Sequence, residues 1–355
     1  MAEEAIAAEE RLTPRQREIL KILIQAYISS AEPVGSSTIQ RIGQLGVSSA
    51  TIRNELCILE ELGYLTQPYT SAGRVPTIKG YRYFVEQLVG RVELPASEQR
   101  TIRHQFHQIR LHLDQWMRLS AAVLAQTSRS VSLVTPPRAA RSRFRHLHLV
   151  SISQRAAVMI LVLGDGRAHE EVILTADYTD QDSLNQVSNR WNHTLRGRSL
   201  REVRASAETG LASAEGWEGE LLARITQLME ESDRASVGEI YSDGLANVLR
   251  HPEFLEIERF RRVVNMLQHA SLLEPILLRM LNTNGVQIII GGEGPYEAIE
   301  HVSLVLSRYG IKHTASGVLG IMGPVRMPYA RAISTVGYVA QLVGSLMADV
   351  YGAYA

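Results

Sequence analysis

The stretch VSSATIRNELCILEELGYLTQPYTSAGRVPTIKGYRYFV, residues 47–85, decides the fold of the N-terminal part of this chain. Its first half carries apolar side chains at the spacing of one helix face: Ile52, Leu56 and Leu59. Ser48 stands before this run, where a hydroxyl favours a helix start, and Gly63 stands after it, where glycine favours a helix end. The pattern predicts a helix that is capped by Ser48 and runs to Leu62.

Two further helices are predicted before this one. Thr13-Pro14 is an N-cap followed by proline at the first helical position, and apolar residues at helical spacing continue to about Ser29. A short second helix follows, capped by Ser36 or Ser37, and a glycine-flanked turn joins it to the third helix. A short helix, a tight turn and a longer capped helix are typical of a helix-turn-helix, whose second helix enters the major groove of DNA.

The face of the third helix opposite its apolar stripe carries a mixed set of side chains: Ala50, Arg53, Asn54, Cys57 and Glu61. Arginine pairs with guanine and asparagine with adenine, so Arg53 and Asn54 are candidate base readers. Hydroxyl side chains at the start of the helix are candidate phosphate contacts: Ser48, Ser49 and Thr51. The alternative is a solvated helix face with ordinary caps.

The residues after this helix predict a β-hairpin. Residues 64–67 are typical of a strand, 68–73 of a turn-rich loop, and 74–77 of a returning strand, with Arg74 expected at the tip. A hairpin directly after a recognition helix is a wing, and an arginine there is expected to contact the backbone or enter the minor groove. Lys79 adds a second basic side chain for phosphate contact. We therefore predict a winged helix-turn-helix DNA-binding domain over residues 1–90.

The charge is uneven along the chain. The formal net charge of all 355 residues is zero, but residues 11–91 contain ten Lys or Arg and six Asp or Glu, a net of +4. The N-terminus is acidic and lacks the pattern of a signal peptide, and no run approaches the roughly 18 apolar residues of a membrane span. The single cysteine, Cys57, excludes an intramolecular disulfide and a cysteine-based zinc cluster. These features predict a cytoplasmic protein without a membrane contact.

The remaining residues predict a mixed α+β organisation. Residues 97–127 have a heptad seam over about three repeats and predict one long helix, either a connecting or dimer-forming helix or one packed on its own domain. Strand patterns occur between 145 and 178 and again after 286, with a helical interval between them, and an apolar helix closes the chain. This order is typical of one α+β domain interrupted by an insertion.

The same residues contain two candidate sites for small ligands or metals. The turn Gly291-Gly292-Glu293-Gly294-Pro295 follows a strand but matches no phosphate-binding motif, so a tight turn is the better interpretation. His146 and His148 share one strand face without a third ligand. No arrangement of catalytic residues is visible, and we expect neither an enzyme, a metal nor a cofactor.

Several stretches resemble the HrcA family of heat-inducible transcription repressors. The resemblance rests on residues 47–85, on LTPRQREILKILIQAYISSAEPVGSSTI from Leu12, and on weaker matches such as GVLGIMGPVRMPYARAI from Gly317. It implies a homodimer that binds a palindromic operator of double-stranded DNA upstream of chaperone operons and that depends on a GroEL-type chaperonin. It also implies a GAF-like domain, placed at 91–205 and 285–355, with an inserted dimerisation domain at 206–284. The alternatives are a metabolite-sensing regulator with a ligand in the GAF-like domain and an RNA-binding winged helix.

Overall fold

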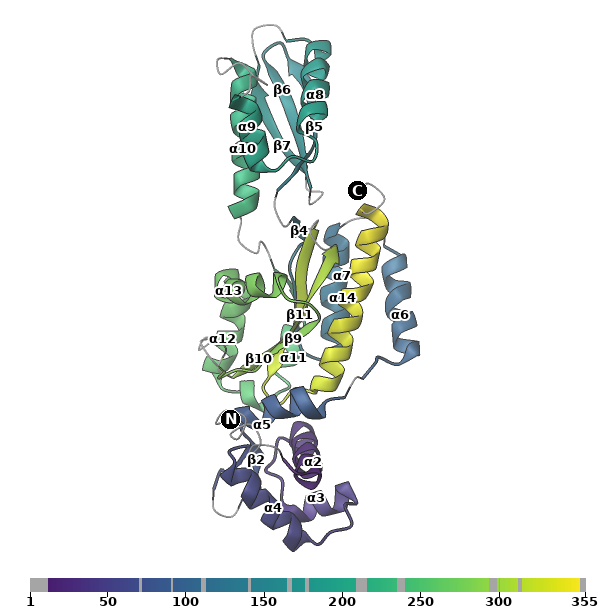
Figure 1. The fold of residues 1–355 in the computed structure, drawn as a ribbon, viewed down its shortest axis with the longest axis vertical. Coiled ribbons are helices and arrows are strands. Elements are labelled where there is room, and N and C mark those ends of the chain that lie inside the picture. The colour runs from purple at the N-terminus through teal and green to yellow at the C-terminus, as the bar shows by residue number, and fades with distance from the viewer. Residues whose placement is uncertain are drawn as a thin grey trace, which may run out of the picture.

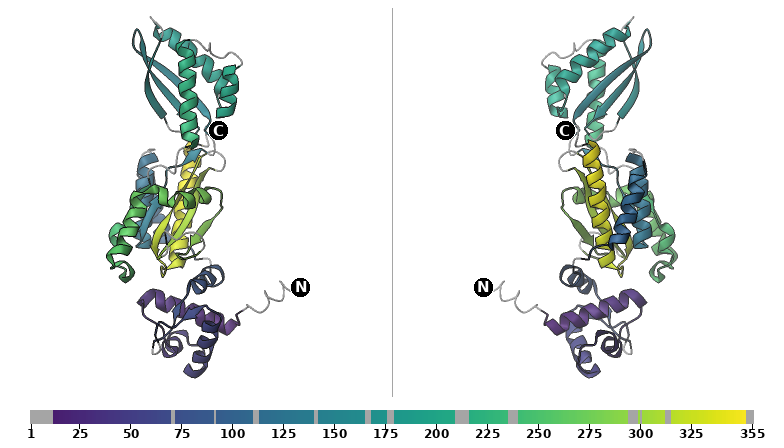
Figure 2. Two further views of the ribbon diagram at one scale, coloured as in Figure 1. Left: turned by 90° about the vertical axis from the view of Figure 1, so that its left-hand side faces the viewer. Right: turned by 90° about the vertical axis from the view of Figure 1, so that its right-hand side faces the viewer.

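The computed structural model shows three units stacked along one long axis, with the helical N-terminal unit at one end (Figure 1). The two side views give the same order, and a separate sheet with its own helices forms the opposite end (Figure 2). The structure describes residues 12–69, 72–90, 92–109, 113–139, 142–164, 168–175, 179–208, 216–234, 240–293, 299, 301–311 and 315–351.

The N-terminal unit is a winged helix-turn-helix, as predicted. Its elements are α2 (Pro14–Ser30), α3 (Ser36–Gly43), α4 (Ser49–Glu61), β1 (Leu65–Thr66), β2 (Val75–Pro76), α5 (Ile78–Tyr83) and the π-helical η1 (Phe84–Leu88). Thr13 caps α2 in a reciprocal capping box with Gln16, which explains the predicted start. The N-cap of α3 is Gly35 rather than Ser36 or Ser37, because helical geometry already begins at Ser36. The three helices bury one apolar core: Ile19, Leu20, Leu23, Ile39, Ile52, Leu56 and Leu59.

The central unit is a mixed α+β layer structure built on an antiparallel sheet. The strands are β3 (Val131–Val134), β4 (Arg138–Ala139), β8 (Tyr241–Asp243), β9 (Val286–Ile289), β10 (Val302–Ile311) and β11 (Ala315–Pro324). Their order is β8-β3-β11-β10-β9, with β4 paired to β11. Helices α7 (Leu113–Ser128) and α14 (Tyr329–Tyr351) cover one face of the sheet. The other face packs on α12 (Ile257–Gln268) and α13 (Ala270–Leu281), and short α11 (Leu245–Val248) and η2 (Pro252–Phe254) join β8 to α12 (Figure 1).

The single long helix expected over 97–127 is wrong. Two helices occupy this segment, α6 (Ala96–His107) and α7, and both lie beside α14 (Figure 1). The heptad side chains Ile102, Phe106, Trp116 and Val123 are buried in the same core as the sheet. The seam therefore packs within its own unit, which was the alternative interpretation.

The third unit has its own sheet and core. It comprises β5 (Phe144–Ser153), β6 (Ala156–Leu163), β7 (Ala168–Leu174), α8 (Gln181–Leu195), α9 (Leu200–Glu208) and α10 (Trp217–Arg234). The strands pair in the order β5-β6-β7, and their alternate residues pack with the helices around Trp191. Asp165 and Gly166, between β6 and β7, where the sequence Gly164-Asp165-Gly166 predicts a hairpin turn, lie outside the described residues.

The boundaries of this unit differ from the sequence expectation. The segment with a separate sheet spans 144–234, whereas the insertion was expected at 206–284. The physical reason is strand pairing: β8 hydrogen-bonds to β3, and α12 and α13 pack on the central sheet. Hydrophobic periodicity identifies a strand but not the sheet that it joins. No helix in the described ranges is long and apolar enough to cross a membrane.

Candidate nucleic-acid interface

The turn between α3 and α4 positions the recognition helix. Gln44 and Gly46 adopt left-handed backbone conformations, with φ of 46° and 65°, which reverse the chain within a few residues. Two side-chain contacts hold the turn: the Ser36 and Ser49 hydroxyl oxygens lie 2.9 Å apart, and Gln40 Nε2 donates to the Val47 carbonyl at 3.2 Å. The angle between α3 and α4 is thus fixed by local hydrogen bonds as well as by the core.

The start of α4 follows the predicted cap. The Ser48 hydroxyl accepts a hydrogen bond from the Thr51 amide at 3.1 Å and lies 2.9 Å from the Thr51 hydroxyl. Ser48 and Ala50 are exposed, while Ser49 and Thr51 are half-buried. A helix N-terminus carries a partial positive charge, so these four residues surround a position suited to a phosphate group.

The exposed face of α4 carries the two predicted base readers. Ile52, Leu56 and Leu59 are buried on the core side, whereas Arg53 and Asn54 are exposed. Within the part of the chain that the structure describes, neither side chain has a hydrogen bond or ion pair to another residue. Their donors are therefore available to an external partner. This exposure agrees with DNA binding and also with the alternative of a solvated helix face.

The wing is shorter than expected. Leu65 pairs with Pro76 and Thr66 with Val75, so the hairpin has two pairs of residues. A Cβ atom on Gly73 would lie 2.5 Å from the Val34 backbone, which explains why a glycine stands where the wing crosses the connection between α2 and α3.

Arg74 does not lie at the tip of the wing, contrary to the sequence prediction. Its backbone N–H and carbonyl both bond to Val34 at 2.9 Å, and its guanidinium forms an ion pair with Glu60 of α4 at 2.8 Å. Its side chain is 17% exposed. Arg74 is the last loop residue before β2, and its bridge to Val34 and its pair with Glu60 join this end of the loop to the helices behind it. The centre of the loop, at Thr70 and Ser71, lies outside the described residues.

Lys79 is exposed on α5, directly after the wing. Its ammonium nitrogen lies 4.8 Å from the centre of the Tyr64 ring, a cation–π contact that holds the side chain near β1.

Tyr69, before the loop centre, is 63% exposed and was missed by sequence reasoning. The available signal was a large aromatic residue in an otherwise polar turn.

The other sequence candidates do not join this surface. His146 and His148 are exposed on β5 in the third unit, and Gly294 and Pro295 lie outside the described residues. Across the described ranges, no group of three His, Cys, Asp or Glu side chains is placed to hold a metal ion. The surface formed by α4, the wing and Lys79 is therefore the candidate site with the best-supported chemistry.

Two family models match the chain. Residues 11–89 match the winged helix-turn-helix transcription repressor HrcA DNA-binding model, and residues 114–333 match the HrcA protein C-terminal domain model. A curated relative from Roseiflexus castenholzii, named heat-inducible transcription repressor HrcA, is 44% identical and covers 96% of each chain. A relative of the same name from Herpetosiphon aurantiacus is 40% identical over 96% of this chain and 97% of its own.

A solved structure described as a hypothetical protein at 2.2 Å resolution has a similar fold. It superposes with a TM-score of 0.62 at 23% sequence identity and covers 96% of this chain and 99% of its own. At that identity the likeness concerns the fold alone.

Proposed function

The chain belongs to the HrcA family of heat-inducible transcription repressors, and on that premise we propose that it represses chaperone operons by binding an inverted-repeat operator as a dimer. The observation that carries this proposal is the exposed α4 face, where Arg53 and Asn54 have no partner among the described residues. These side chains have the donor patterns that read guanine and adenine in the major groove. The protein acts by binding in the cytoplasm, where the operator is, and not by catalysis.

The remaining contacts follow from the position of each group. The hydroxyls of Ser48, Ser49 and Thr51 and the N-terminus of α4 bind the DNA backbone, and the Ala50 methyl group can contact a thymine methyl. Lys79 adds a phosphate contact beside the wing. Arg74 has a supporting role, because its pairing with Glu60 and low exposure leave little of it for DNA.

The dimer is proposed to form through the open face of the β5-β6-β7 sheet. One face of this sheet packs on its helices, while the other carries apolar side chains in paired positions across the three strands: Val150, Val158 and Val172. On β7, Val172 is 67% and Leu174 is 72% exposed. Exposed apolar patches of this kind mark interaction surfaces, and a second copy is the partner that an inverted repeat requires.

Two finer features remain proposals from the family resemblance. We take the central unit to be GAF-like, since its antiparallel sheet lies between two helical layers. We also take a GroEL-type chaperonin to be the partner that keeps the repressor active. Adding purified chaperonin to a repressor–operator gel shift at increasing temperature tests that partnership, and no rescue of binding would argue against it.

The proposal as a whole is tested with duplex DNA selected by the protein from a random library. Arg53→Ala should weaken binding by about 1–3 kcal/mol and relax the preference at one base position in each half-site. Arg201→Ala, which removes an exposed arginine from α9 in the third unit, is the matched control. Equal operator binding by Arg53→Ala and the parent would show that α4 is not the recognition helix. A matched RNA duplex tests the RNA-binding alternative.

A further inference from the structure

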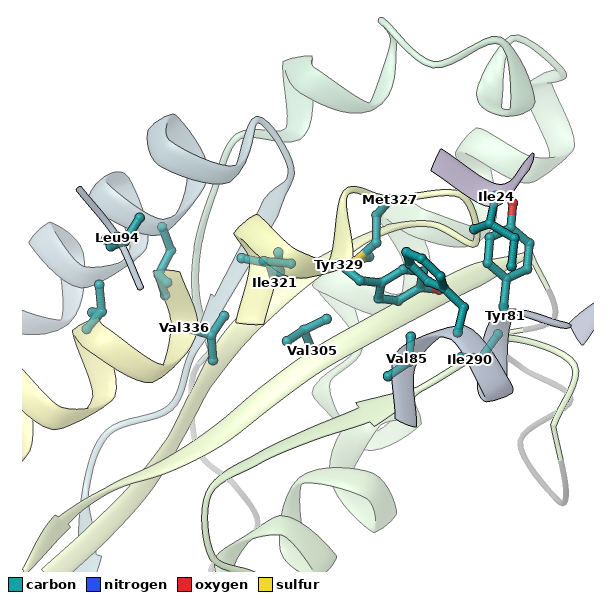
Figure 3. Packing of buried hydrophobic residues seen from close by; sticks show 14 of the residues in the cluster. Ile24, Tyr81, Val85, Leu94, Ile290, Val305, Ile321, Met327, Tyr329 and Val336 are labelled. Atoms are coloured by element: carbon teal, nitrogen blue, oxygen red, sulfur yellow. The ribbon is translucent and has the colours of Figure 1, made fainter. Parts of the chain in front are cut away.

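The contact between the N-terminal unit and the central unit is continuous and apolar. Ile24 of α2 and Tyr81 of α5 lie against Ile290, Met327 and Tyr329 of the central unit (Figure 3). The Tyr81 and Tyr329 rings have centroids 6.2 Å apart. All five side chains are buried, so the two units share one core at this point.

Two arginines bridge the units beside this apolar contact, in opposite directions. Arg82 of α5 reaches the central unit, where its Nε donates to Glu293 Oε1 at 2.8 Å, its Nη2 bonds to Glu293 Oε2, and the same Nη2 donates to the Ile288 carbonyl at 3.1 Å. Arg326, in the loop between β11 and α14, reaches back to the N-terminal unit. Its Nη1 donates to the Ile28 carbonyl at 3.0 Å, near the end of α2.

Both arginines are held in fixed orientations. Arg326 is 12% exposed, and Glu253 accepts hydrogen bonds from its Nε and, at 3.2 Å, from its Nη2. Arg82 makes the same bidentate arrangement with Glu293. Bidentate arginine–carboxylate pairs restrict both the distance and the angle between the groups they join. The bonds between the units are therefore a bidentate pair from Arg82 to Glu293 and a single hydrogen bond from Arg326, which Glu253 of its own unit holds in place. Together they resist rotation of the two units as well as their separation.

The covalent connection is less restrictive than the bridges. The π-helical segment Phe84–Leu88 ends in the extended residue Val89. From there to α6, no helix or strand occurs in the described residues, and a Cβ on Gly90 would meet nothing within 4 Å. The orientation of α4 relative to the central unit thus depends on the side-chain contacts more than on the chain that links them.

We infer that Arg82 and Arg326 are positioning residues for operator recognition, which make the dimer selective for the spacing between half-sites. The inference rests on the proposed function, a dimer on an inverted repeat. One inserted base pair separates the half-sites by about 3.4 Å and rotates one against the other by about 35°. A dimer with fixed recognition helices cannot follow that change, whereas one with rotating N-terminal units can.

The experiment compares binding to a panel of duplexes built from the selected operator. The half-sites stay constant while one or two base pairs are inserted or removed between them, and a further probe carries a single half-site. The parent should lose at least about tenfold in affinity for each altered spacing, since only one half-site can dock well. The Arg82→Gln/Arg326→Gln double variant should bind all spacings within about threefold of one another while binding the single half-site like the parent.

Three controls separate positioning from damage to the fold. Arg224→Gln removes a bidentate pair of similar exposure, with Glu171, inside the third unit and should keep the parent's spacing preference. Circular dichroism and sedimentation must show the same helix content and dimer fraction for every variant. The single variant Arg82→Gln is measured on the same panel, and exchanging the charges in Arg82→Glu/Glu293→Arg should restore part of the selectivity that this single variant loses.

The outcomes distinguish this inference from the function on which it rests. A parent with no spacing preference overturns both the dimeric operator model and the positioning role. A selective parent with an equally selective double variant overturns the positioning role alone. A variant that loses affinity equally for all spacings and for the single half-site also overturns it, because that result is a general loss of binding.

Discussion

Replacing Gly80 with alanine should separate the wing from the helix that follows it. Gly80 lies in α5 and faces the backbone of Tyr64, at the start of the wing. A Cβ atom at this position would lie 2.2 Å from the Tyr64 carbonyl oxygen, a distance that must grow to at least 3.0 Å. The same oxygen accepts a hydrogen bond from the Thr77 amide at 3.1 Å, so its retreat strains that bond too.

The expected change in the local free energy of opening is the sum of three contributions. Overpacking against a buried backbone costs about 1–3 kcal/mol. Weakening the bond from Thr77 costs up to about 1 kcal/mol. Alanine also restricts the unfolded chain more than glycine does, which stabilises the folded state by about 0.4–1 kcal/mol. The net expectation is a loss of about 1–3 kcal/mol in the local free energy of opening, because the clash is with backbone and no flexible side chain can yield.

Hydrogen exchange measured by mass spectrometry on peptides from residues 59–84 is the suitable assay, since it reports local opening in the full chain. Gly90→Ala is the matched control, because its new Cβ meets nothing within 4 Å, and it should leave exchange in these peptides unchanged. Equal protection in Gly80→Ala and Gly90→Ala would refute the argument that the close approach to Tyr64 positions the wing.

Three further outcomes are expected. Lys79→Gln should weaken binding to all DNA sequences alike and lower the slope of log K against log salt by about 1, as measured by titration at several salt concentrations. Val172→Asp/Leu174→Asp places charges on the open sheet face and should yield monomers in sedimentation with unchanged circular dichroism; a persistent dimer would place the interface elsewhere. The Arg224 guanidinium lowers the pKa of Glu171 below its ordinary value, so this pair stabilises the fold above the unfolded pKa of about 4.3, and the stabilisation is lost as pH falls through the lower folded value. Urea unfolding should therefore show the parent more stable than Arg224→Gln near neutral pH, with the difference shrinking as pH falls below about 4.3. A difference that stays constant in acid would contradict this assignment.

Local signals in the sequence were sufficient for most elements of the N-terminal unit. Ser48 and Gly63 limit α4 as predicted because caps act through the few residues next to them. The segments of β5, β6 and β10 were also predicted as strands, from their apolar runs; in the structure β5 and β6 bury alternate residues, whereas β10 is buried at most positions.

Features that depend on distant contacts were not predictable in the same way. Arg74 was expected at the tip of the hairpin, but its backbone bonds to Val34, forty residues earlier, hold it at the end of the loop beside β2. The seam of Ile102 and Trp116 keeps its spacing across a chain reversal, so periodicity alone gave one helix instead of two. For the α4 face, the sequence named Arg53 and Asn54 from chemistry, and the structure adds that both are exposed.

The pairing of β3 with β8 has an evolutionary consequence. Val134 at the end of β3 pairs with Tyr241 at the start of β8, so in topological terms the two strands are a hairpin, and the part of the chain between β4 and β8 is its loop. Lengthening a loop costs little conformational entropy, about 0.6 kcal/mol for each doubling. Natural variation could therefore enlarge, shrink or replace this oversized loop while the host sheet keeps its register, and an engineer could substitute a short turn for it.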